Sequence, residues 1–383
     1  MNQEMRYQQL DALRGVAALT VVISHFSLLG PLPILRHLPL RLLCGGHAAV
    51  VLFFTLSGFV LALQVNNDRK LSYAEYIVRR ACRIYVPYFV AVIVSYVGFT
   101  VFNHGPVNWA GDWFNNCWLA TLADISIARH LLFVFPFETY RLNPILWSLV
   151  YEMRISLFFM PVALAVFSMS SWRALCCAAL LSIAVCVYAT GSDTHVLFGN
   201  VRGEWLPTLH YLLMFVTGAV LAKHRRYISA RLGGTPAAAR IGMILLAGSV
   251  VLYLIAERLS YFAPKIPGDF VFEWLVLIAA SGIISCAVAL APFARFLQLP
   301  PLPFLGRISY SLYLYHAVVL FGIVHFVGER FGPAITLTLA AALIVPVSYA
   351  GYRFVERPGM QLGHRLARRF QAARVLAESV PRS

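Results

Sequence analysis

The stretch DALRGVAALTVVISHF (residues 11–26) is an apolar run of helical length that also carries an acid, a guanidinium and an imidazole, from Asp11, Arg14 and His25. Similar apolar runs recur along all 383 residues, and 60% of the chain is hydrophobic while only 12% is charged. A soluble protein of this size would carry about a quarter charged residues. Because about 20 apolar residues cross a bilayer as one helix, the sequence predicts an all-α, polytopic membrane protein.

The apolar runs predict about ten transmembrane helices. They lie at about 10–30, 46–66, 84–103, 145–168, 174–190, 207–222, 241–256, 271–291, 309–327 and 333–352. A further stretch, 114–135, is long enough to cross but holds two Asn, an Asp, an Arg and a His. We predict that this stretch lies on the outer face of the membrane or dips into it.

The distribution of the basic residues predicts how the chain is oriented across the membrane. With ten spans and a cytoplasmic N-terminus, the inner loops and both tails hold 21 of the 31 Lys and Arg residues, and the outer loops hold 8. A crossing at 114–135 would reverse every later loop, so the positive-inside rule favours ten spans with both termini cytoplasmic. The same rule explains the net charge of +15 better than nucleic-acid binding does. We expect a multi-pass protein of the cell inner membrane.

Two regions are predicted: a transmembrane domain over 1–355 and a basic cytoplasmic tail over 356–383 that lies on anionic lipid. The seven cysteines show no metal-ligand or C-x-x-C spacing, and most fall within apolar runs. They are interpreted as small core residues, and no metal is expected.

The first helix presents two ionisable side chains along one line. Arg14 and His25 are eleven residues apart, which places them only ~20° apart in direction and ~16 Å apart along a helix. Asp11 is three residues before Arg14 and can pair with it. A snorkelling arginine and a structural histidine are the alternative. The shared face favours a functional pair, because ionisable groups inside a membrane are costly.

The segment NPILWSLVYEMRISLFF (residues 143–159) carries Glu152 and Arg154 into a span that enters from the outer side. We expect Glu152 to reach a depth close to that of His25, where a carboxylate can orient an imidazole as a general base. The alternative is a local charge pair between Glu152 and Arg154, although residues two apart point away from each other on a helix.

The segment YIVRRACRIYVPY (residues 76–88) places Arg79, Arg80 and Arg83 at the cytoplasmic mouth of the third span. Arg80 and Arg83 are three apart and share a face. Guanidinium groups bind phosphate oxygens with bidentate geometry, so the cluster suits the phosphates of a nucleotide-like cofactor. Ordinary positive-inside charge explains the cluster equally well.

The segment GRISYSLYLYHAVVL (residues 306–320) spaces Tyr310, Tyr313 and His316 three residues apart. Their hydroxyls and imidazole could line a cavity inside the bundle. An interfacial aromatic belt is the alternative, and it explains Tyr310 well but His316 poorly.

Together these segments resemble the acyltransferase 3 family of integral membrane acyltransferases. The similar features follow one another in the family order along most of the chain. They are LDALRG with the Arg14–His25 spacing, LFFTLSGFVL (52–61), the Arg80-x-x-Arg83 pattern before IYVPY, the LWSL run ending at Glu152, GRISYSLYLYH and YRFVERP (352–358).

The resemblance implies transfer of an acyl group, usually acetyl, from acyl-CoA to a hydroxyl of a carbohydrate such as O-antigen, capsule or exopolysaccharide. His25, Arg14 and Glu152 would be the catalytic residues. The donor would be bound by Arg80, Arg83, Arg14, Tyr313 and His316. The family often has a second acidic residue after Glu152 and then Gln, but this chain has Met153 and Arg154. A carboxylate pair is therefore not expected here.

Two other functions suit parts of the sequence. A transporter or flippase for a lipid-linked saccharide would also have ten spans and intramembrane charges, although no repeat between the two halves is evident. A non-catalytic subunit of a polysaccharide assembly complex would need neither His25 nor the Arg80/Arg83 pair. The donor (acyl-CoA), a carbohydrate or glycolipid acceptor and the bilayer are therefore the expected partners.

Overall fold

The protein is a bundle of α-helices in a computed structural model that describes residues 7–30, 32, 44–67, 71–103, 105–118, 126–132, 141–191, 205–260 and 268–379. No β-strand occurs among these residues. The helices are α1 (Gln8–Ser27), α2 (Gly46–Asn67), α3 (Tyr73–Phe102), α4 (Asp112–Cys117), α5 (Ile127–Leu132), α6 (Leu146–Ser168), α7 (Ser171–Gly191), α8 (Leu206–Lys223), α9 (Arg225–Gly233), α10 (Pro236–Ser260), α11 (Gly268–Ala289), α12 (Ala291–Phe296), α13 (Leu302–Gly351), the π-helix η5 (Tyr352–Glu356) and α14 (Arg357–Ser379).

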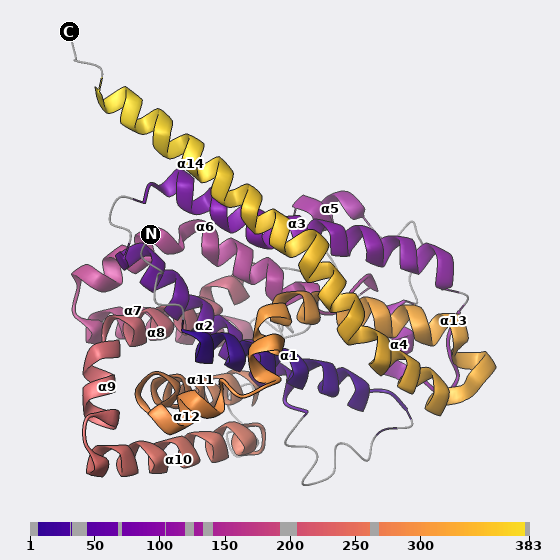
Figure 1. The fold of residues 1–383 in the computed structure, drawn as a ribbon. Coiled ribbons are helices and arrows are strands. Elements are labelled where there is room, and N and C mark those ends of the chain that lie inside the picture. The colour runs from indigo at the N-terminus through magenta and orange to yellow at the C-terminus, as the bar shows by residue number, and fades with distance from the viewer. Residues whose placement is uncertain are drawn as a thin grey trace.

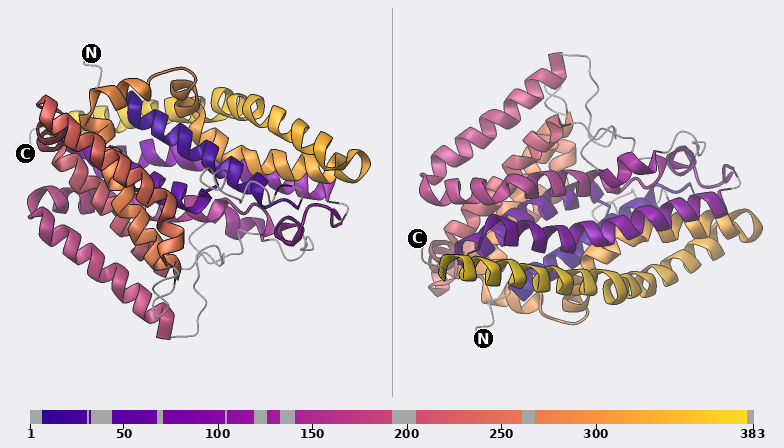
Figure 2. Two further views of the ribbon diagram at one scale, coloured as in Figure 1. Left: turned by 90° about the horizontal axis from the view of Figure 1, so that it is seen from below. Right: turned by 90° about the horizontal axis from the view of Figure 1, so that it is seen from above.

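Nine of the described helices are long and apolar enough to cross a membrane, and the last of these contains two crossings. Helix α13 is interrupted at Gly332, which has φ 70°, and Pro333 follows it. Glycine tolerates this left-handed backbone conformation and proline cannot continue the preceding helix. Figure 2 shows the two halves of α13 running back side by side. The predicted multi-pass, all-helical fold of about ten spans is therefore confirmed.

The stretch 114–135 differs from the long spans. Its described parts belong to two helices of six residues each, α4 and α5, which are too short to cross a bilayer. Residues 119–125 and 133–135 lie outside the described residues. The placement on the outer face stays a prediction.

The centre of the bundle is formed by α1, α2, α3, α6 and α13, with α7 to α12 gathered at one side (Figure 1). Helix α1 packs against α13 and α2, and α2 packs against α8. Helix α2 is almost entirely enclosed, whereas α10 exposes Ile241, Ile244 and Val251. Exposed aliphatic side chains on a peripheral helix are expected when the surrounding solvent is lipid.

Close packing of α1 on α13 depends on two glycines. A Cβ atom added at Gly15 would lie 2.5 Å from the backbone nitrogen of Gly306, and one added at Gly306 would lie 2.5 Å from the carbonyl oxygen of Asp11. Small residues allow helix backbones to approach in membranes. This contact fixes the height of α1 relative to α13, and both helices carry site residues.

The basic C-terminal segment forms α14, which packs along α3. Gly359 and Gly363 of α14 lie against Cys82 of α3. The start of α1 and the end of α14 lie toward the same side of the molecule (Figures 1 and 2). An even number of crossings gives this arrangement. Which side is cytoplasmic stays a prediction.

Candidate active site

A histidine pair links α1 to α13. The Nδ1 atom of His25, near the end of α1, lies 2.8 Å from Nε2 of His316. Trp113 of α4 stacks on the His25 ring with ring centroids 5.1 Å apart. His316 is fully buried, whereas His25 is partly exposed. The pair therefore joins a buried imidazole to one that is accessible from within the bundle.

The hydrogen bonds define which nitrogen atoms carry protons. Nδ1 of His316 lies 3.0 Å from the carbonyl oxygen of Leu312, and a carbonyl can only accept. Nδ1 of His316 must therefore be the donor, and Nε2 of the neutral ring accepts from Nδ1–H of His25. With both rings neutral, Nε2 of His25 carries a lone pair and can accept a proton.

Two hydroxyl groups lie next to this pair. Tyr313 is one turn before His316, and the two rings meet edge to face with centroids 6.1 Å apart. The Tyr313 hydroxyl lies 2.6 Å from Oγ of Ser148, and either atom can donate. The carbonyl oxygen of Ile145 lies 3.3 Å from the Tyr313 hydroxyl, and when Tyr313 donates its one proton there, Ser148 is the donor to Tyr313. These bonds join the start of α6 to the middle of the first half of α13.

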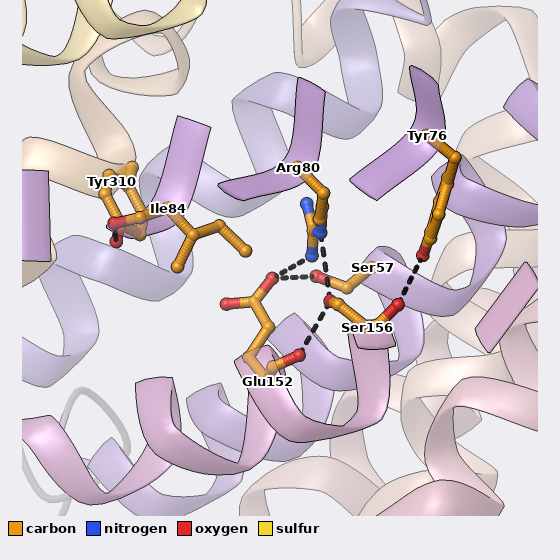
Figure 3. Close-up of polar contacts among 7 residues, drawn as sticks. All are labelled: Ser57, Tyr76, Arg80, Ile84, Glu152, Ser156 and Tyr310. Carbon is orange, nitrogen blue, oxygen red and sulfur yellow. Dashed lines mark hydrogen bonds and ion pairs between the residues drawn. The ribbon is translucent and has the colours of Figure 1, made fainter. Parts of the chain in front are cut away.

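An ion pair between α3 and α6 forms the second part of the site (Figure 3). Nη2 of Arg80 lies 2.6 Å from Oε1 of Glu152, and Nε of Arg80 donates to Oγ of Ser156 at 3.0 Å. Ser57 of α2 donates to the same carboxylate oxygen of Glu152 at 3.0 Å. Three helices therefore meet at the carboxylate of Glu152.

Two tyrosine hydroxyls hold α3 in this position. Tyr76 donates to the carbonyl oxygen of Ser156 in α6 at 3.0 Å, and Tyr310 of α13 donates to that of Ile84 at 2.9 Å (Figure 3). The start of α3 is capped by Ser72, whose side chain accepts from the backbone N–H of Glu75, the serine-x-x-glutamate pattern of a helix start. Local capping and tertiary bonds together orient the Arg80 side chain.

A narrow cavity is lined by the Arg80–Glu152 ion pair and by the hydroxyl groups of Ser148 and Tyr313. It encloses about 60 Å³, enough for a few water molecules. Its polar lining comes from five helices and comprises Arg14, Ser57, Arg80, Arg83, Ser148, Glu152, Ser309, Tyr310 and Tyr313. Three guanidinium groups and one carboxylate face this space, so its walls carry excess positive charge that favours an anion.

Arg14 and Arg83 differ from Arg80 in how they are held. Nη1 of Arg14 lies 3.9 Å from Oδ1 of Asp11, the neighbour three residues earlier. Arg83 forms no hydrogen bond or ion pair with any described residue. These two guanidinium groups are therefore more available to a bound anion than Arg80 is.

The structure separates two residues that the sequence placed together. Among the described residues, Glu152 contacts Arg80 and Ser57, whereas His25 contacts His316 and Trp113, so the expected Glu152–His25 contact is not made. The alternative pairing of Glu152 with Arg154 is not made either. Arg154 is fully buried, with its guanidinium carbon 4.5 Å from the ring centre of Trp205.

The histidine pair and two serines were missed by the sequence analysis. His316 was assigned to a cavity wall, and nothing in the sequence indicated that its partner is His25 in another helix. Ser57 and Ser148 both lie within the quoted segments, at 52–61 and 143–159. Hydroxyls inside those apolar runs are the signal that could have identified them.

Helices α1 to α13, with every site residue above, fall within residues 7–353, which match the family description "Acyltransferase domain". The chain belongs to the acyltransferase 3 family. It contains an acyltransferase domain and is a multi-pass membrane protein, which confirms the family resemblance and the predicted enzyme class.

The chain is 22% identical over 374 residues to O-acetyltransferase OatA of Staphylococcus aureus (strain NCTC 8325 / PS 47). It is 24% identical over 384 residues to the putative peptidoglycan O-acetyltransferase YrhL of Bacillus subtilis (strain 168). These alignments cover 91% and 93% of this chain but 56% and 55% of the relatives. The chain thus spans about half the length of the curated relatives it matches. No solved structure matches it.

Proposed function

We propose that this acyltransferase moves an acyl group, most simply acetyl, from acyl-CoA on the cytoplasmic side to a hydroxyl of a cell-surface carbohydrate. The observation that carries the proposal is the hydrogen-bonded series from the Leu312 carbonyl through His316 to His25. It leaves Nε2 of His25 as a proton acceptor inside the bundle. One relative is named as an O-acetyltransferase and the other as a putative peptidoglycan O-acetyltransferase, which supports a carbohydrate acceptor.

The cavity walls suit the donor. Phosphate oxygens of acyl-CoA would bind the guanidinium groups of Arg14 and Arg83, which have few partners of their own. Arg80 would add positive charge while it stays bonded to Glu152. A nucleotide is too large for a cavity of about 60 Å³, so the pantetheine arm would be the part of the donor that enters it. Its walls extend to Tyr313, whose ring contacts His316.

The reaction then needs one proton acceptor. Nε2 of His25 takes the proton of the acceptor hydroxyl as its oxygen attacks the thioester carbon. The tetrahedral intermediate collapses, the carbon–sulfur bond breaks, and the CoA thiolate receives the proton from His25. His316 holds the imidazole of His25 in the required tautomer throughout, as the orienting partner of a general base does.

The test is acetyl transfer by the purified protein in liposomes. Acetyl-CoA labelled in the acetyl group is supplied with surface glycan from the producing cells, deacetylated by mild base. We expect label on the glycan with the wild-type protein and none with His25→Gln, because an amide cannot take up the proton. His224, an exposed histidine bonded to Ser171, provides the matched control, and His224→Gln should transfer normally. Equal transfer by His25→Gln and wild type would overturn the mechanism.

The same assay tests the transporter alternative. A flippase would move a lipid-linked saccharide without consuming acetyl-CoA, and it would release no free thiol. Absence of both thiol release and label transfer by the wild-type protein would reject the proposed function and favour transport. A stable acetyl adduct on His25, seen by mass spectrometry after mixing with acetyl-CoA alone, would instead make His25 a covalent carrier.

A further inference from the structure

A second cluster of ionisable groups lies outside the site described above. Glu273 of α11 is fully buried and contacts three side chains from two other helices. Its Oε2 accepts from Nε2 of His210 at 2.6 Å, and its Oε1 accepts from the Tyr211 hydroxyl at 2.8 Å and contacts Nε2 of His47. His210 contacts Ser182 of α7 through its other ring nitrogen at 2.8 Å.

The proposed acyl-transfer mechanism uses none of these residues. A carboxylate enclosed in a membrane bundle is costly, and such groups usually serve binding or transport. The described residues contain no group with the arrangement needed to hold a metal ion. The Nε2 atoms of His47 and His210 are instead both directed at Glu273. The cluster is therefore a hydrogen-bonded support that holds one imidazole in place.

His47 is the open end of this cluster. Its side chain is 28% exposed, whereas those of His210 and Glu273 are 0% exposed. Trp147 stacks on its ring with centroids 5.6 Å apart and planes 12° apart, and Phe272 contacts it at 5.7 Å. Trp147 and Phe272 are themselves partly exposed. An oriented imidazole is thus flanked by accessible aromatic surface.

The residue that precedes His47 packs against the residue that precedes His25. Gly46, which precedes His47, packs so closely on α1 that an added Cβ would lie 2.7 Å from Oγ of Ser24, which precedes His25. Trp147 precedes Ser148, whose hydroxyl bonds to Tyr313 at the end of the donor cavity. The cluster and the histidine pair therefore occupy the same level of the bundle.

We propose that His47, Trp147 and Phe272 bind the acceptor carbohydrate, with Glu273 as the residue that positions His47. Pyranose rings combine apolar C–H faces with hydroxyl groups, so they suit aromatic surface beside a fixed hydrogen-bonding group. The subsite would hold the sugar next to Nε2 of His25, while the donor arrives through the cavity lined by Arg14 and Arg83. This inference rests on the proposed function.

The test separates acceptor binding from donor binding. Initial rates of acetyl transfer are measured in liposomes against concentrations of base-deacetylated surface glycan and, separately, of acetyl-CoA. Trp147→Ala should raise the half-saturating glycan concentration about tenfold and change that of acetyl-CoA much less. Trp172, an exposed tryptophan at the start of α7, is the matched control, and Trp172→Ala should change neither value.

A second pair of variants keeps the subsite testable if Trp147→Ala fails to fold. His47→Gln and Glu273→Gln should both raise the half-saturating glycan concentration, and the double variant should be little worse than either one because Glu273 acts through His47. Equal increases for glycan and acetyl-CoA, or none, would reject the subsite while the proposed function stands. Failure of the wild-type protein to acetylate the glycan would reject the proposed function itself.

Discussion

His25 and His316 are 291 residues apart in the chain and lie 2.8 Å apart through their ring nitrogens. The contact crosses from α1 to the first half of α13, the two helices whose backbones meet at Gly15 and Gly306. Because the Leu312 carbonyl fixes the proton on His316, the contact also fixes the proton on His25. His25 can act as a base because its tautomer is fixed, with the proton on Nδ1 and the lone pair on Nε2.

The first prediction concerns His316. His316→Leu removes the acceptor for Nδ1–H of His25, so the ring can turn or change tautomer, and we expect kcat for acetyl transfer to fall about a hundredfold. His316→Gln keeps an acceptor oxygen and should recover part of that loss. The half-saturating acetyl-CoA concentration should stay close to the wild-type value in both. A His316→Leu protein with normal kcat would show that the pairing has no catalytic role.

The second prediction concerns the close contact that fixes the position of α1 relative to α13. Gly15→Ala places a methyl group against the backbone of Leu305 and Gly306, which cannot move aside, and overpacking of this kind costs about 1–3 kcal/mol. We expect a lower unfolding temperature in detergent and a lower kcat, because α1 must shift against α13. Gly248 has no neighbour within 4 Å, so Gly248→Ala should be neutral or stabilising by up to ~1 kcal/mol. Equal unfolding temperatures and equal kcat values for the two variants would show that the Gly15–Gly306 contact does not determine the position of α1.

The helical fold could be predicted because each span is a local property of about 20 residues. The two halves of α13 were predicted at 309–327 and 333–352, on either side of Gly332, where the structure interrupts the helix. The π-helix at 352–356 and the packing of α14 on α3 were not predicted. They depend on contacts between distant segments, such as Gly359 against Cys82.

The site could be predicted only where its contacts are local. The approach of Asp11 to Arg14 follows from three-residue spacing on one helix. The pairing of Glu152 with Arg80 does not follow from spacing within one helix. It depends on how α3 and α6 are rotated about their axes. The expected depth of Glu152 in the membrane was compatible with a contact to His25. The rotation of α3 and α6 about their axes instead directs its carboxylate to Arg80. Glu273 was overlooked, although it is the only charged residue within the predicted span 271–291.

The third prediction concerns topology. With ten crossings, the positive-inside rule predicts that both termini lie in the cytoplasm, because 21 of the 31 basic residues would then lie on the inner side. A reporter enzyme that is active only outside the cytoplasm, fused after residue 383, should therefore be silent. The same reporter inserted after Gly105, between the third span and α4, should be active. Activity of the C-terminal fusion would require a further crossing or a reversed chain.

The fourth prediction distinguishes two roles for Glu152. If it holds Arg80, Glu152→Gln and Arg80→Gln should each reduce the free energy of unfolding, and a double-mutant cycle should give a coupling energy of about 0.5–3 kcal/mol. The loss of activity in the double variant should then be less than the product of the two single losses. If Glu152 instead orients His25, its effect on kcat should be the same with and without Arg80. Unfolding in detergent and transfer rates from the same four proteins provide both measurements.

The last prediction concerns the donor. Arg83 lines the cavity and has no hydrogen-bond partner among the described residues, so its guanidinium is available to the phosphates of acetyl-CoA. Arg83→Ala should weaken acetyl-CoA binding by about 1.5–3 kcal/mol for each charge-assisted bond lost, roughly a 10- to 150-fold change. Binding of S-acetylpantetheine, which lacks the nucleotide and its phosphates, should change much less. Arg79 lies on the same helix but does not line the cavity, so Arg79→Ala should affect neither donor. Equal losses for both donors with Arg83→Ala would mean that the arginine acts on the arm or on the fold, and the nucleotide would have to bind elsewhere.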